Sequence, residues 1–224
     1  KNGNSFCCYC MRRLFLNDTE DKHKKNITYE HIVPHKIKYN EWQSDKAHYL
    51  KFSNLNKKHI AVCFEGKLTN AQKKVKITGM PYPHFVSYHN LVASCNGATF
   101  EDKTLVNSHC CNNNRQERFV MPIYLSPDLV NGISYTSKGE LDYDDSVYDC
   151  SWFDKKHLNL TNSWITLVRR IWCKISKSGY TDIDVEMARN DKNLRQNIID
   201  DVDSNNEISS WADNDIAWNL FSEY

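Results

Sequence analysis

The sequence is poor in glycine and proline, and it carries no excess of charge of either sign. Only 7 glycines and 5 prolines occur among its 224 residues, which excludes a collagen-like or low-complexity chain. No run of about 18 apolar residues is present, so the sequence offers no candidate transmembrane helix. The 29 basic residues nearly balance the 28 acidic ones. Net charge therefore argues neither for nor against a nucleic-acid partner.

The residues that are present indicate a globular protein. Hydrophobic residues make up 40% of the chain, charged residues 25% and aromatic residues 12%, and this composition is typical of folded domains rather than disordered tails. A length of 224 residues lies near the upper edge of one ordinary domain. We expect one compact domain, or a small module with an elaborated second half.

Nine cysteines are a high count, and their spacing favours a metal site. Cys7 and Cys10 form a C-x-x-C pair, which lets two thiolates from one turn reach the same tetrahedral ion. A second half-site is available from Cys95 and either Cys110 or its neighbour Cys111. Disulfides are disfavoured because the count is odd and nothing visible looks like a signal peptide. The sequence predicts a structural zinc ion held by Cys7, Cys10, Cys95 and Cys110, with Cys111 as the alternative last ligand.

Between the two half-sites lie further residues of a recognisable pattern. Glu30-His31-Ile32-Val33-Pro34 comes first, and Asn90-Leu91 precedes Cys95 by a few residues. With the C-x-Y-C segment at its start and Asn112 after the last cysteine, this order resembles the HNH nuclease family. The resemblance covers about residues 6–116. It implies an α+β protein with a ββα-metal core (the HNH or His-Me finger fold), stapled by a zinc site of four cysteines.

Phosphodiester hydrolysis requires a general base with a pKa near neutrality, and histidine is the residue that supplies one. The resemblance assigns this role to His31. Glu30, adjacent in an expected strand, points to the opposite side of the backbone unless the strand bends, and in this family it joins the site as a metal ligand. Asn90 completes the family name and is expected to order the loop between the two strands.

The second ligand of the catalytic ion is expected in the helix that follows the last zinc cysteine. Asn112 is the first candidate and Asn114 the alternative. Carboxylate and amide oxygens suit Mg²⁺ or Mn²⁺, so either ion is the predicted catalytic cofactor. Arg115 and His35 are predicted to contact the nucleic acid.

The chain is predicted to consist of two regions. Residues 1–120 form the predicted nuclease core, with an insertion at about 37–88 that holds a helical pattern at 39–52 and a basic cluster at 73–76. That cluster is either a solvated charged face or a nucleic-acid contact surface. Residues 121–224 predict a hairpin around 133–136 and a mostly helical region. Its helices are expected after Thr161-Asn162, at 185–202, and after Ser209 or Ser210.

A looser resemblance extends to about residue 170. The chain resembles the HNH nuclease subunits of prokaryotic antiviral systems such as Septu and certain retrons. The residues that carry this resemblance are Pro122, Gly139-Glu140, Leu158-Asn159-Leu160 and Arg169. It implies a cytoplasmic prokaryotic protein, away from membranes, that acts in antiviral defence beside an ATPase subunit.

Three functions are weighed. A metal-dependent endonuclease acting on DNA, or else on RNA, is favoured because a purely structural zinc module needs neither Glu30-His31 nor Asn112. The alternative is a zinc-stabilised module that binds nucleic acid or protein without catalysis. A redox protein using Cys7 and Cys10 is disfavoured because no βαβ pattern surrounds them.

Overall fold

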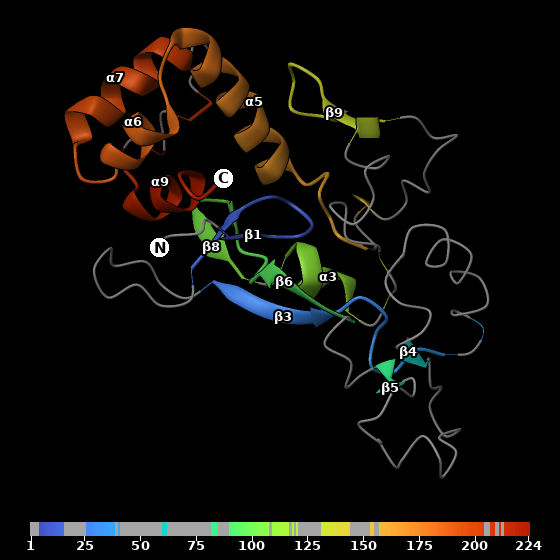
Figure 1. Cartoon of the computed structure of the whole chain (residues 1–224). Coiled ribbons are helices and arrows are strands. Elements are labelled where there is room, and N and C mark those ends of the chain that lie inside the picture. The colour runs from blue at the N-terminus through green and yellow to red at the C-terminus, as the bar shows by residue number, and fades with distance from the viewer. Residues whose placement is uncertain are drawn as a thin grey trace.

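The computed structural model shows a mixed α+β architecture with small sheets and, among the residues that the structure describes, five helices with defined bounds (Figure 1). The residues it describes are 5–15, 26–38, 40, 60–61, 82–84, 90–107, 109–116, 118, 120, 131–143, 153–154, 157–203, 207–208, 211 and 213–224. The helix expected at 39–52, except Asn40, and the basic cluster at 73–76 lie outside these residues.

All described strands are short and occur in pairs. Four pairs are antiparallel: β1 (Ser5–Phe6) with β2 (Arg13–Leu14), β3 (Ile27–His31) with β6 (Leu91–Cys95), β7 (Thr99–Glu101) with β8 (Thr104–Val106), and β9 (Ile133–Tyr135) with β10 (Leu141–Tyr143). One pair is parallel, namely β4 (Ile60–Ala61) with β5 (Tyr82–Pro83).

The β3–β6 pair positions the site. Its register places Ile27 opposite Cys95 and His31 opposite Leu91, so the predicted base and the third predicted zinc ligand lie at opposite ends of one strand pair. The short helix α3 (Cys111–Arg115) lies against β6 (Figure 1). A strand pair and the helix that follows it are thereby brought together from segments far apart in the sequence.

The hairpin and the first helix of residues 121–224 form as expected, whereas the helices that follow differ from the prediction. The hairpin around 133–136 is present as β9–β10, and Asn162 caps α5 (Ser163–Ser178) by accepting a hydrogen bond from Ile165 N at 2.9 Å. The single helix expected at 185–202 is wrong. Two helices occur there, α6 (Asp182–Met187) and α7 (Lys192–Val202), because the Asp191 side chain caps a new helix start.

The single helix expected after Ser209 or Ser210 is interrupted: Trp211 is helical, Asp213 and Asn214 are not, and a new helix follows. α9 spans Asp215–Phe221 and is capped by Asn214, whose side chain accepts hydrogen bonds from Ile216 N and Ala217 N. Trp211 therefore precedes α9, and the expected caps Ser209 and Ser210 lie outside the described residues.

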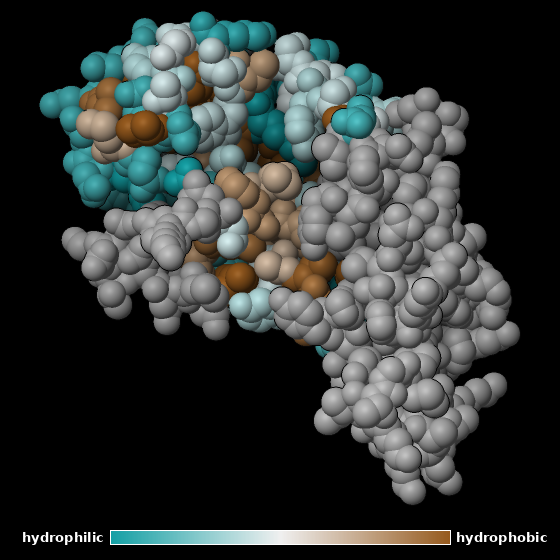
Figure 2. Space-filling view, viewed as in Figure 1, coloured by the Kyte–Doolittle hydropathy of each residue, from teal (hydrophilic) through white to brown (hydrophobic). Residues whose placement is uncertain are grey.

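One continuous core joins the strands to the helices. Phe100 of β7 packs on Trp164 of α5, with ring centroids 5.7 Å apart, and Trp164 packs on Trp211 at 4.6 Å. Helices α5, α6, α7 and α9 form a layer on one side of β3 and β6 (Figure 1), and the face of that layer seen in Figure 2 is mostly hydrophilic. Among the described helices, none is both long and apolar enough to cross a membrane.

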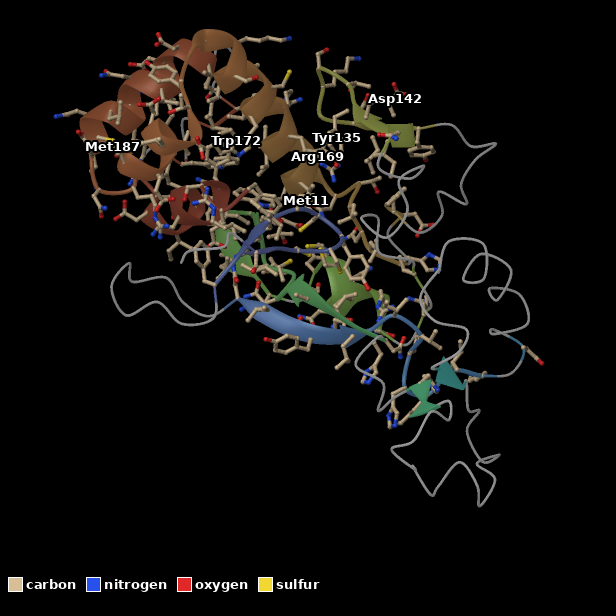
Figure 3. All side chains as sticks on the ribbon, viewed as in Figure 1. Met11, Tyr135, Asp142, Arg169, Trp172 and Met187 are labelled. Atoms are coloured by element: carbon tan, nitrogen blue, oxygen red, sulfur yellow. The ribbon has the colours of Figure 1, made fainter. Side chains whose placement is uncertain are left out.

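The β9–β10 hairpin is fixed to α5 by a close approach. Gly139 in its turn has φ of 79°, and a Cβ atom there would lie 2.0 Å from the carbonyl oxygen of Thr166. Only glycine fits both the backbone conformation and the space. The guanidinium of Arg169 in α5 then lies 4.6 Å from the ring centroid of Tyr135 (Figure 3), which adds a cation–π contact.

A buried ion pair joins the C-terminal end of the helical region to the β1–β2 loop. The guanidinium of Arg12, which is 3% exposed, pairs with the carboxylate of Glu223. The same carboxylate accepts a hydrogen bond from Asn26 Nδ2 at 3.0 Å, and Arg13 N donates to the Glu223 carbonyl at 2.7 Å. Residues at both ends of the chain thus form one packed unit.

Candidate active site and metal centre

The first two thiols of the metal centre come from a tight turn between β1 and β2. Cys7 N donates to the carbonyl of Arg12 at 2.8 Å, and Met11 N donates to the carbonyl of Cys7 at 3.1 Å. Met11 has φ of 63°, a left-handed conformation that reverses the chain after Cys10. The C-x-x-C spacing, closed by these bonds, places both sulfurs on one side of the turn.

The other thiols come from the end of β6 and the start of α3. After Cys95 the chain turns at Gly97, whose φ is 73° and whose missing Cβ would lie 2.4 Å from the carbonyl oxygen of Cys110. The Gly97 carbonyl accepts hydrogen bonds from His109 N and Cys110 N, at 2.8 and 3.2 Å. This close approach folds the segment after β8 back against Cys95.

Four buried sulfurs gather where these segments meet. The Sγ atoms of Cys7, Cys10, Cys95 and Cys111 all lie within 4.8 Å of one another, and sulfur atoms cluster between the β1–β2 loop and α3 in Figure 3. Sγ–Sγ distances are 3.8 Å for Cys7–Cys111 and 3.7 Å for Cys10–Cys95.

These distances are compatible with a zinc ion. A tetrahedral site with Zn–S bonds of about 2.3 Å separates its sulfurs by about 3.8 Å, whereas a disulfide brings them to about 2.0 Å. All four thiols are free cysteines with no disulfide partner. A set of four thiolates is also the soft ligand set that zinc accepts. The four cysteines could therefore hold a metal ion, with a geometry that zinc fits.

The structure favours the alternative last ligand, Cys111, over the first choice, Cys110. Cys110 is also buried, but its sulfur is not among the four that share the cluster. Its backbone is extended at the N-cap of α3, whereas Cys111 has φ of 54° and donates its amide to the carbonyl of Leu158 at 2.8 Å. Spacing alone cannot separate adjacent cysteines, because the left-handed turn at Cys111 is set by tertiary contacts.

The four thiols of the cluster do not share one direction of pKa shift: burial raises the pKa of Cys10 and Cys111, whereas the pKa of Cys7 and of Cys95 is lowered. Hydrogen bonds from the thiols of Cys10, Cys110 and Cys111 lower the pKa of Cys95 well below its ordinary value, and thiolate is the form that binds metal. Burial raises the pKa of Cys8, which lies outside the four-sulfur set. Cys8 is thus a buried neutral thiol, and its amide donates to Ala93 O at 3.1 Å.

Asn90 bridges the backbone next to the predicted base. Its side-chain oxygen accepts a hydrogen bond from Val33 N at 2.8 Å, and its amide nitrogen donates to the carbonyls of Val33 and His84 at 3.0 and 2.9 Å. Its own carbonyl accepts from Ile32 N at 2.8 Å. Asn90 is fully buried, so these bonds order the chain that leaves β3 after His31.

Glu30 and His31 are the last two residues of β3, and both are partly exposed. The His31 ring stacks on that of the exposed His35, with centroids 6.1 Å apart. Burial raises the pKa of Glu30, against the opposing effect of the Arg115 charge. Consecutive strand residues point to opposite faces, so the regular strand by itself does not aim both side chains at one ion.

In the described part of the chain, the four cysteines are the only group of three or more His, Cys, Asp or Glu side chains close enough to share an ion. A second ion would therefore need Glu30 together with amide oxygens, water and a substrate phosphate. This is a ligand set that Mg²⁺ commonly accepts, because it retains several of its waters.

The two asparagine candidates of α3 have different surroundings. Asn112 is partly exposed, and its oxygen accepts a hydrogen bond from Arg115 Nε at 3.4 Å. Asn114 donates its amide to the carbonyl of His157 at 2.6 Å, which ties it to the segment before α5. Asn112 is thus connected to the guanidinium that reaches β3, whereas Asn114 is connected to the segment before α5.

Arg115 differs from its predicted role as a nucleic-acid contact. Its side chain is 1% exposed, and its guanidinium donates to the carbonyl of His31 and, at 3.2 Å each, to the carbonyls of Ile32 and Arg118. A guanidinium that is buried and engaged inside the protein is not accessible to a phosphate. Local sequence predicted a cation there but not its burial.

Sequence reasoning missed two further buried residues. His84 lies in the insertion, is fully buried, and has Nε2 2.9 Å from the Pro34 carbonyl; burial lowers its pKa. Arg12 follows the C-x-Y-C turn and its charge is compensated by Glu223 at the other end of the sequence. Neither carries a local signal, because each partner is distant along the chain.

No protein-family description matches the chain, and no match was found among curated proteins or solved structures. The assignment of a function rests on the motif order and on the contacts described above.

Proposed function

We propose that the protein is a metal-dependent HNH endonuclease that hydrolyses phosphodiester bonds of nucleic acid, most readily DNA. The observation that carries this proposal is the bridge made by Asn90. Its amide holds Val33, two residues after His31, across 57 positions of sequence, which is the loop-ordering role expected of the central asparagine. The four-cysteine cluster by itself does not involve this loop.

The arrangement of β3, β6 and α3 gives further support. The α3 helix begins at a cysteine of the metal cluster and lies against β6, while β6 pairs with the strand that carries Glu30 and His31. A ββα-metal core requires this order of elements. The cysteine cluster, with zinc bound, would replace the hydrophobic core that five-residue elements cannot supply.

In the proposed reaction, His31 accepts a proton from the attacking water as general base. Glu30 and Asn112 would hold a divalent cation, Mg²⁺ or Mn²⁺, through their side-chain oxygens. When bound, this cation supplies positive charge to the phosphate oxygens and the departing oxygen. The exposed His35, stacked on His31, lies where a nucleic-acid strand would approach.

The biological setting is proposed from the motif resemblance alone. A place beside an ATPase subunit in a prokaryotic antiviral system follows from the resemblance to Septu and retron nuclease subunits. No described residue tests it, and the cleavage assay below is designed to be read with and without such a partner.

The test is a cleavage assay with plasmid DNA and total RNA in Mg²⁺, Mn²⁺ or EDTA. Wild type is compared with His31→Ala and with His157→Ala, a control whose ring pairs with Asp154. We expect divalent-ion-dependent cleavage by wild type and His157→Ala, and a loss of at least about 100-fold in His31→Ala. Zinc content, read by mass spectrometry, stays at one ion per chain in all three.

Cleavage of RNA but not DNA would change the substrate and keep the reaction. Equal activity in His31→Ala and wild type would reject His31 as the base. If neither polymer is cut, with or without a candidate ATPase partner, while zinc is retained, the zinc-stabilised binding module is the correct function.

A further inference from the structure

Arg115 connects the two elements that carry the proposed catalytic groups. From α3 its guanidinium reaches the end of β3, where it donates to the carbonyls of His31 and, at 3.2 Å, Ile32. Its Nε lies 3.4 Å from the side-chain oxygen of Asn112. One side chain thus contacts the backbone of the predicted base and the side chain of a predicted ion ligand.

The surroundings of Arg115 fix its orientation. Its side chain is 1% exposed, it donates a further hydrogen bond to the Arg118 carbonyl at 3.2 Å, and its guanidinium carbon lies 5.8 Å from the ring centroid of Tyr9. Because the guanidinium is a planar fork, these bonds define both the position and the tilt of the group. A lysine ammonium carries its three N–H donors on a single nitrogen, so it cannot reach all the acceptors that the three guanidinium nitrogens of Arg115 serve.

We infer that Arg115 is a positioning residue of the active site, which sets the placement of His31 and Asn112 relative to each other rather than contacting the nucleic acid. The inference rests on the proposed endonuclease function. The positioning role replaces the phosphate contact expected from the sequence. The two roles differ in the kinetic parameter that they affect. A phosphate contact contributes to binding and to its salt dependence. A positioning residue contributes to the rate of the chemical step, since small misplacements of catalytic groups are costly.

The chain contains a matched control in Arg195. This residue is also fully buried, donates to two main-chain carbonyls (Ala188 at 3.0 Å and Arg189 at 2.8 Å), and lies 5.4 Å from the ring centroid of Trp218. It differs from Arg115 in that it also pairs with the Asp215 carboxylate at 2.8 Å. It belongs to the helical region rather than to the β3–β6–α3 unit. Arg195→Lys therefore removes the same kind of buried fork without touching the proposed site.

The experiment compares Arg115→Lys and Arg195→Lys with the wild-type chain. We expect both variants to lower the melting temperature and to retain one zinc per chain. Only Arg115→Lys lowers kcat, by about 10- to 100-fold, while its KM and the salt dependence of nucleic-acid binding, measured in EDTA, stay within about twofold of wild type. Unchanged kcat in Arg115→Lys would overturn the inference, as would a weaker salt dependence of binding.

A second readout needs neither activity nor a folded lysine variant. Imidazole ¹H–¹⁵N spectra report the environment of His31, with the signal assigned by its absence in His31→Ala. We expect this signal to shift in Arg115→Lys, or in Arg115→Gln if the lysine variant does not fold, and to stay in place in Arg195→Lys. A His31 signal unmoved by both Arg115 variants would overturn the inference. Inactive wild-type protein, by contrast, would reject the proposed function alone, because the spectra still test the positioning.

Discussion

The strand region of β1–β3, β6 and α3 and the helical region from α5 to α9 are both buried at their centres, but different groups fill them. Beside apolar side chains such as Ile32 and Val33, the strand region buries sulfur and polar groups, namely the cysteine cluster, Asn90 and Arg115. In the helical region the buried side chains are mainly isoleucine, valine, tryptophan and phenylalanine.

The sizes of the elements explain this difference. The longest described strands and α3 each have five residues, whereas α5 has 16. A five-residue helix is too short to form alone, so α3 depends on Cys111 and on the Arg115 bonds to β3. A 16-residue amphipathic helix supplies its own apolar face. The candidate site is therefore held together by residues far apart in the sequence, whereas the helical region is held together by apolar residues that recur along each helix.

Loss of one metal ligand is expected to have the largest effect, and to fall on the strand region. Cys111→Ser should abolish zinc binding and destabilise that region severely, because the apparent free energy of structural zinc binding is on the order of 10 kcal/mol. Cys110→Ser should keep the zinc. Zinc content and hydrogen exchange of residues 91–111 measure both; zinc loss in Cys110→Ser but not in Cys111→Ser would reverse the ligand assignment.

Truncation of a core aromatic should affect the helical region instead. Trp218 is fully buried, and its Nε1 donates to the Val185 carbonyl at 3.2 Å. Trp218→Ala is expected to cost about 3–5 kcal/mol in the free energy of unfolding, as measured by urea titration. Zinc content at low temperature should be unchanged. Loss of zinc from the folded variant would show that the cysteine cluster depends on the core of the helical region.

The ion pair between the regions should have an intermediate effect. In Glu223→Gln the buried guanidinium of Arg12 loses its counter-charge, with an expected cost of about 1.5–3 kcal/mol. Glu140→Gln is the control, because Glu140 is exposed in the hairpin turn. Thermal unfolding of the two variants gives the difference; equal stability would mean that the Arg12–Glu223 pair does not couple the regions.

The smallest effect is expected at a helix cap. Asn214 accepts hydrogen bonds from the amides of Ile216 and Ala217, both at 3.1 Å, and starts α9. Asn214→Ala should cost about 1 kcal/mol and leave zinc content and cleavage unaffected. Denaturant titration measures this cost, and a loss above about 3 kcal/mol would show that α9 depends on its cap rather than on its buried face.

Much of the helical region could be predicted from local sequence. Asn162 as the cap of α5, the apolar stripe of that helix and the β9–β10 hairpin are encoded by residues within one or two turns of each other. The predicted helix over 185–202 failed at Asp191, where a capping side chain competes with helix continuation. The spacing of apolar residues gives no sign of this competition, because it does not depend on the capping side chain.

The residue types available for the candidate site can be read from the chain without its fold: the paired cysteines, Glu30-His31, Asn90 and the polar start of α3. The folded arrangement adds which of two adjacent cysteines joins the cluster, that Arg115 is buried with its guanidinium on the His31 carbonyl, and that Arg12 pairs with Glu223. These features could not be predicted because burial and hydrogen bonding depend on partners as far as 83 and 211 positions away. Local patterns carry the chemistry of a side chain but not the identity of its distant neighbours.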